Sequence, residues 1–89
     1  MLTLPAVVTH DHALDTARGL KVQVGSQADN VVIDASSLTQ FDSSALAVML
    51  ACSREAAAAG KTFAVVGLPT KLGQLAVLYG VAELIPAVA

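Results

Sequence analysis

The sequence alternates between short apolar runs and amphipathic segments, a pattern that predicts strands and helices in turn. Residues 31–33 (Val-Val-Ile) form a continuous apolar run that ends at Asp34, which is typical of a central strand covered on both faces. Residues 62–66 form a second buried strand of the same kind. Residues 2–8 are interrupted by Pro5, and because proline cannot donate a hydrogen bond to a neighbouring strand, only an edge strand is expected there.

The helices and their order predict the fold class. A first helix covers residues 10–24, where apolar positions recur at helical spacing, although residues 21–24 suit a strand equally well. A last helix follows Pro69 and stops at Gly80. This order predicts an α/β fold, with a small, mainly parallel sheet of about four strands and about three helices packed on it. A tail at residues 84–86 is expected to close over the sheet.

The middle helix, residues 43–59, has the clearest pattern. It begins after Asp42 and ends at Gly60. The side expected to face the sheet carries Leu46, Met49, Leu50, Ser53 and Ala57. The opposite side carries a strip of small side chains bordered by two charges: Ser44, Ala47, Ala51 and Ala58, with Arg54 and Glu55 at the edges. Such a strip allows another backbone to approach closely.

The composition indicates one domain with a partner. At 89 residues the chain fits a single domain, residues 1–89. Apolar residues make up 55% of the chain and charged residues 13%, so part of the apolar surface is expected to face another protein. The net charge of −2 and the lack of a basic stripe argue against nucleic-acid binding.

The cysteine and histidine content points to a cytoplasmic protein that holds no metal or cofactor. Cys52 is the only cysteine, so no internal disulfide can form, and with no signal peptide the chain suits a reducing cytoplasm. We expect Cys52 to be a small buried hydrophobe. His10 and His12 have no further ligands at metal-binding spacing. No apolar run approaches the ~18 residues that span a bilayer, so the membrane is expected to be reached only through a partner.

Asp42, Ser43 and Ser44 place an acid and two hydroxyls at the start of the middle helix, and three roles are open. Asp42 or Ser43 can cap the helix, which contributes ~1 kcal/mol, but one cap does not account for both serines. A nucleophile needs an oriented base and an oxyanion site. His10 and His12 lie on a different element and no G-x-S-x-G motif surrounds the serines, so an enzyme is not expected.

Phosphorylation of Ser44 or Ser43 is the third role. A phosphoserine adds ~1.5 to 2 negative charges, which the start of a helix favours and the adjacent Asp42 opposes. Because these local effects nearly cancel, a phosphate here is expected to act on the binding of a partner rather than on folding.

Several stretches resemble the STAS domain, the fold shared by sulphate-transporter tails and bacterial anti-sigma factor antagonists. They are residues 31–34 (VVID), 41–46 (FDSSAL) and 60–62 (GKT), and the resemblance extends over about residues 31–86. Residues 71–81 (KLGQLAVLYGV) are similar to the MlaB type, the small STAS subunit of Mla phospholipid-transport ABC systems.

The resemblance implies a non-enzymatic protein-interaction subunit that binds the cytoplasmic ATPase of an ABC transporter and supports its assembly and activity. It places the partner surface at the start and outer face of the middle helix. The residues expected at the contact are Asp42, Ser43, Ser44, Ala47, Ala51, Arg54 and Glu55. By position, Ser43 matches the hydroxyl residue that follows the aspartate in MlaB subunits, and Ser44 matches the serine phosphorylated in anti-sigma antagonists.

Other interpretations keep the fold and change the partner. An anti-sigma factor antagonist would be bound by a kinase that phosphorylates Ser44.

Some features of the chain depart from the family pattern. Ala45 stands where MlaB subunits and anti-sigma antagonists usually have glycine, and the N-terminal region predicts one strand where the family commonly has two. Tyr79 is expected to cover the core with its hydroxyl in water. A carrier of small ligands has little support, because no pocket can be argued from 89 residues alone.

Overall fold

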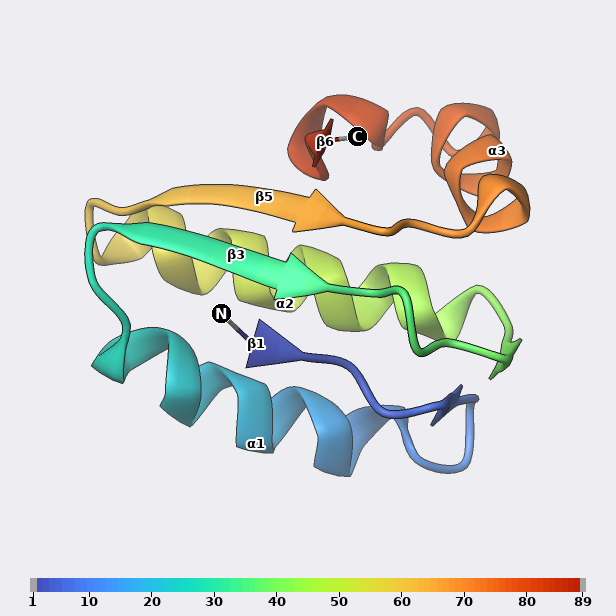
Figure 1. The fold of residues 1–89 in the computed structure, drawn as a ribbon, viewed down its shortest axis with the longest axis horizontal. Coiled ribbons are helices and arrows are strands. Elements are labelled where there is room, and N and C mark those ends of the chain that lie inside the picture. Colours follow the sequence, from blue (N-terminus) through green and yellow to red (C-terminus); the bar gives the residue numbers. More distant parts are fainter. Residues whose placement is uncertain (1, 89) are drawn as a thin grey trace.

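Strands and helices alternate along the chain, and several short strands add to those that the sequence predicts (Figure 1). The computed structural model describes residues 2–88. The elements are β1 (Leu2–Thr3), β2 (Val7–Val8), α1 (Ala13–Ser26), β3 (Asn30–Asp34), β4 (Gln40–Phe41), α2 (Ser44–Ala58), β5 (Thr62–Val66), α3 (Thr70–Leu78), the 3-10 helix η1 (Ala82–Leu84) and β6 (Ala87–Val88).

Four strands form one parallel sheet in the order β1-β3-β5-β6, which confirms the predicted parallel arrangement. Ile33 of β3 is aligned with Leu2 of β1 and with Val65 of β5, so apolar side chains lie side by side across the sheet. The C-terminal tail does not close over the sheet; it extends it, because Val65 N donates to Pro86 O (2.8 Å) and β6 pairs with β5. A separate parallel pair consists of β2 and β4.

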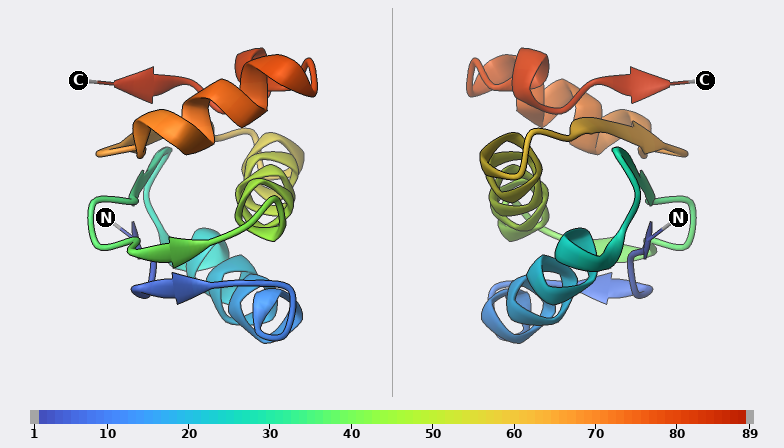
Figure 2. Two further views of the ribbon diagram at one scale, coloured as in Figure 1. Left: turned by 90° about the vertical axis from the view of Figure 1, so that its right-hand side faces the viewer. Right: turned by 90° about the vertical axis from the view of Figure 1, so that its left-hand side faces the viewer.

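Helices α1 and α2 lie on the same face of the four-stranded sheet (Figure 2). Side chains alternate across a strand, so Val31 and Ile33 point toward these helices and are buried. Val32 points to the other face and is half-buried. The expectation that this strand is covered on both faces is therefore wrong, because both crossover helices next to β3 pack on one side. The same expectation is wrong for β5, in which only Val65 is buried.

The buried side of α2 differs from the one that the helical wheel predicts. Leu46 and Met49 face the core as expected, whereas Ala57 is exposed. The reason is that α2 packs against α1 as well as against the sheet, which moves the buried arc toward Cys52. Cys52 is buried, as predicted, and loss of solvation raises the pKa of its thiol to about 11.

Pro5 divides the N-terminal segment into two short strands, where one was predicted. Before the proline, Leu4 N donates to Asp34 O (3.0 Å), next to the pairing of β1 with β3 at the edge of the sheet. After it, the chain forms β2, which pairs with β4 in the register Val7 to Gln40. The sequence did not indicate β4, because a strand of two residues carries no periodic pattern.

Both ends of α1 differ from the prediction. The helix begins at Ala13 rather than at residue 10, because residues 9–12 form a turn in which His12 N donates to Thr9 O (3.0 Å). It continues to Ser26, so residues 21–24 are helical and the strand alternative is wrong.

Lys61 closes the C-terminal end of α1 from outside the helix. Its ammonium donates to the carbonyl oxygens of Val24 (3.0 Å), Gly25 (3.2 Å) and Gln27 (2.7 Å). The last turn of α1 has no basic residue of its own. Lys61, which directly precedes β5, therefore supplies the positive charge that the end of a helix favours.

Candidate functional site

Asp42 holds together the start of α2 and the turn before α1. Its Oδ1 accepts a hydrogen bond from Ser44 N (2.8 Å), and its Oδ2 accepts one from His10 N (3.0 Å), from a residue 32 positions earlier in the chain. The amides of His10 and Ser44 lower the pKa of the Asp42 carboxyl, because both stabilise the charged form. Asp42 is thus the residue that caps the helix, and its two oxygens are both engaged.

The two serines differ in their surroundings. Ser43 is exposed, and its side chain makes no capping hydrogen bond. Ser44 is half-buried. Within residues 2–88 neither hydroxyl is hydrogen-bonded to a histidine, the pairing on which an activated nucleophile depends. Ser43 is therefore the hydroxyl that another molecule reaches most easily.

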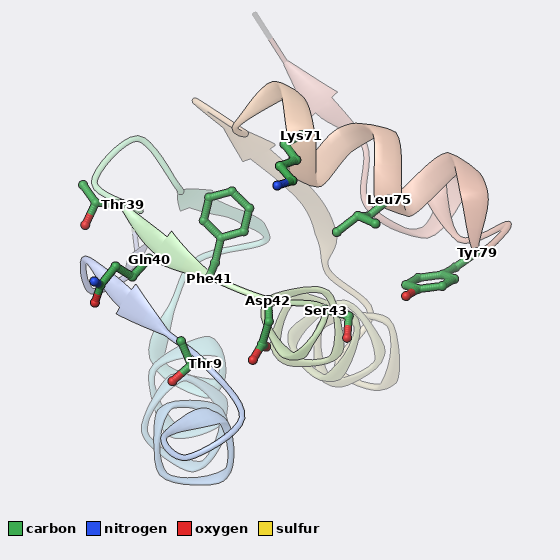
Figure 3. A pocket seen from close by; sticks show the side chains of 9 residues that line it. All are labelled: Thr9, Thr39, Gln40, Phe41, Asp42, Ser43, Lys71, Leu75 and Tyr79. Carbon is green, nitrogen blue, oxygen red and sulfur yellow. The ribbon is translucent and has the colours of Figure 1, made fainter.

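A groove with a volume of about 840 Å³ opens beside Ser43, between the start of α2, strand β4 and helix α3 (Figure 3). We call it the β4–α3 groove. Its lining residues are Thr9, Thr39, Gln40, Phe41, Asp42, Ser43, Lys71, Leu75 and Tyr79. Hydroxyl, amide and charged groups surround two apolar side chains, Phe41 and Leu75. Such a surface suits a ligand that carries both polar and apolar groups.

A second, smaller groove of about 320 Å³ lies between α1 and α2. It is lined by His10, Ala13, Leu14, Ala17, Ala47 and Val48, and is mostly apolar. Ala47, which belongs to the strip of small side chains on α2, therefore lies beside α1. Leu14, at 63% exposure, forms an open rim of this groove.

The residues expected at a partner contact do not gather in one concavity. Asp42 and Ser43 line the β4–α3 groove, whereas Ala47 lines the groove between α1 and α2. Arg54 and Glu55 are exposed further along α2 and line neither groove. Ala51 is half-buried on the same helix. A partner that touches all of these residues has to lie along the length of α2.

Sequence reasoning missed most of the β4–α3 groove. Lys71 and Tyr79 lie on α3 or at its end, and Thr9 lies before α1, so their approach to Ser43 depends on the tertiary fold. Tyr79 does not cover the core as predicted; it is 56% exposed at the C-terminal end of α3. Two signals were available. The MlaB-like stretch of residues 71–81 contains both Lys71 and Tyr79, and the apolar run of residues 75–79 is longer than one buried face of a helix requires.

The described part of the chain contains no group of three or more His, Cys, Asp or Glu side chains that could hold a metal ion. None of its helices is both long and apolar enough to cross a bilayer.

Comparisons with known proteins agree with this architecture. The family model described as "Mlab, STAS domain" matches residues 1–86. In overall structure the chain is similar to the crystal structure of a candidate anti-sigma factor antagonist from Thermotoga maritima. The two share 15% sequence identity with a TM-score of 0.77, over 94% of this chain and 74% of the other. At that identity the likeness shows the fold alone. Among curated proteins, no sequence gave a significant match.

Proposed function

Since this chain belongs to the MlaB-type family of STAS domains, we propose that it is a non-enzymatic subunit that binds and supports the cytoplasmic ATPase of an Mla-type ABC phospholipid transporter. In this role it contributes to the lipid asymmetry of the outer membrane. It resides in the cytoplasm and reaches the inner membrane only through the transporter.

The open start of α2 is the observation that carries the proposal. The carboxylate of Asp42 is used within the domain, because both of its oxygens accept backbone hydrogen bonds. The neighbouring Ser43 hydroxyl is exposed and makes no capping bond. Asp42 therefore fixes the position of Ser43 while leaving its hydroxyl to a partner.

The outer face of α2 supports a contact that extends beyond Ser43. Ala47 is exposed and Ala51 is half-buried, so a partner helix or loop can approach the α2 backbone closely. Arg54 and Glu55 present charges of both signs one to two turns further along. A small-residue surface edged by opposite charges favours a specific protein partner, because mismatched charges are penalised on docking.

Replacement of Ser43 by glutamate tests the proposal. We expect Ser43→Glu to weaken binding of the purified transporter ATPase by at least about ten-fold in titration calorimetry, because a bulky anion enters the contact. The melting temperature should change by less than about 2 °C, since the Ser43 side chain makes no capping bond. Ser37→Glu, at an exposed serine of a different loop, is the matched control and should leave binding unchanged.

Failure of the wild-type domain to bind the ATPase would refute the proposal. If Ser43→Glu lost thermal stability together with binding, the role of Ser43 would instead be structural.

The second candidate is an anti-sigma factor antagonist that is switched by phosphorylation. Two hydroxyls at the open start of α2 favour it, although Ser44, the position that matches the phosphorylated serine, is half-buried. Mass spectrometry of the protein purified from growing cells distinguishes the two functions. The switch requires a phosphorylated fraction at Ser44 or Ser43 and binding to a kinase, whereas the transporter role requires neither.

A further inference from the structure

Strand β4 has an edge that no other strand occupies. Among the described strands, β4 pairs only with β2. On the β2 side, Gln40 N donates to Ala6 O (3.0 Å). Because neighbouring residues of a strand direct their backbone groups to opposite edges, Phe41 directs its amide and carbonyl away from β2. Figure 3 shows that this second edge faces α3 across the β4–α3 groove.

Lys71 brings a cation to the same groove. It is the only positively charged side chain among the described residues that line it. Its ammonium makes no hydrogen bond or ion pair within residues 2–88, and Figure 3 shows it directed into the space beside Phe41. Asp42 lies at the other end of the groove, with its carboxylate directed away from Lys71. An anionic group that enters the groove is therefore attracted to the α3 end and repelled from the α2 end.

Apolar surface lies between these two charges. Phe41 and Leu75 are half-buried and point into the groove from β4 and from α3. Tyr79 follows Leu75 by one helical turn and is 56% exposed, and Leu78 beside it is 75% exposed. An apolar side chain that enters between Phe41 and Leu75 covers surface that the domain itself leaves open to water.

We propose that the β4–α3 groove binds an extended segment of the partner protein, which adds as a strand to the edge of β4. The segment places an apolar side chain between Phe41 and Leu75 and an aspartate or glutamate beside Lys71. Strand addition of this kind draws its affinity from main-chain hydrogen bonds and its specificity from alternate side chains. One positive charge is too few to bind nucleic acid or an anionic membrane. The groove is also too open to enclose a small molecule. The chemistry of the segment follows from the groove; only its assignment to the ATPase rests on the proposed function.

A peptide selection tests the groove without the ATPase. A random heptapeptide library displayed on phage is selected against the immobilised domain, with Lys71→Glu and Lys21→Glu as parallel baits. We expect enriched peptides to carry Asp or Glu close to an aliphatic or aromatic residue and to lose binding to Lys71→Glu by at least about ten-fold. Lys71→Glu should select peptides with Lys or Arg instead. Lys21 is an exposed lysine on α1, outside the groove, so Lys21→Glu should select the same peptides as the wild type.

The backbone contact has its own readout. With the best selected peptide added, amide hydrogen exchange should slow at Phe41, and NMR shifts should concentrate in residues 39–43 and 71–79. Shifts confined to α1 and the outer face of α2, peptides without an acidic residue, no enrichment, or equal binding to Lys71→Glu would each overturn the inference.

Binding of the ATPase separates this inference from the proposed function. If the ATPase binds and Lys71→Glu binds it equally well, the inference fails and the proposed function stands. If acidic peptides bind through Lys71 but the ATPase does not, the proposed function fails and the groove keeps its role for another protein.

Discussion

The ammonium of Lys61 joins the end of α1 to the start of β5, and its removal should lower the stability of the whole domain. It makes three hydrogen bonds to carbonyl oxygens at 2.7 to 3.2 Å. A hydrogen bond with a charged donor contributes ~1.5–3 kcal/mol, and a positive charge at a helix C-terminus adds ~0.3–1 kcal/mol. The bond to Gly25 is exposed and competes with water, and holding a lysine in one rotamer costs ~2 kcal/mol. We therefore expect Lys61→Met, which keeps the aliphatic part of the side chain, to lower the free energy of unfolding by about 2 kcal/mol.

Urea denaturation followed by circular dichroism measures this loss, which corresponds to about 8–16 °C in melting temperature for a domain of this size. The loss should persist in 0.5 M NaCl, since salt screens an exposed ion pair far more than a part-buried hydrogen bond to a carbonyl. Lys21→Met removes an exposed lysine from α1 and is the matched control, expected to change stability by less than about 0.5 kcal/mol. A loss below about 0.5 kcal/mol in Lys61→Met, or one that disappears in salt, would refute the reasoning.

Three further predictions concern the fold around the site. A Cβ at Gly67 would lie 2.7 Å from Cβ of Ser36, and φ at this position is +67°. Gly67→Ala should therefore lower the free energy of unfolding by about 2–4 kcal/mol. Gly60→Ala, with a similar φ of +73° and open space around it, should cost only about 1–2 kcal/mol; equal losses in urea titrations would rule out the steric cause. Cys52, with a thiol pKa of about 11, should resist a thiol reagent at pH 8 in the folded protein and react at once in 6 M urea; fast reaction without urea would show that the thiol is accessible. Asp42 has a folded pKa below its usual 3.8, so its contribution to stability is present above that pH and is lost as the pH falls through the lowered value. Asp42→Asn should therefore be less stable than the wild type at pH 7, with the difference shrinking below pH 3.8; a constant difference down to pH 2 would contradict this assignment.

The main elements could be predicted because each carries its own local pattern. The apolar runs at residues 31–33 and 62–66 are too short for helices and suit parallel strands, although only Val31, Ile33 and Val65 are buried. The stop of α2 before Gly60 and of α3 before Gly80 follows from positive φ values that glycine adopts without strain. Short strands such as β4 lack such a pattern, because two residues show no periodicity. Their pairing depends on residues that lie far away in the sequence.

The candidate site likewise has features that the local sequence predicts and features that depend on the tertiary structure. The acid and the hydroxyls at residues 42–44 are adjacent in sequence, so their place at the start of a helix could be read from local signals. Which oxygen is engaged and which hydroxyl is exposed depends on the amide of His10, 32 residues away. That Lys71 and Ser43 line one groove depends on where α3 lies relative to β4.

The sequence by itself determined the α/β class, the parallel character of the sheet and the start of α2, because strand and helix periods and capping residues act within a few neighbouring positions. Only the tertiary structure decided that α1 and α2 cover one face of the sheet and that β4 keeps an open edge beside Lys71. The physical reason is that packing and pairing join residues 30 or more positions apart, and local propensity does not select among such pairings.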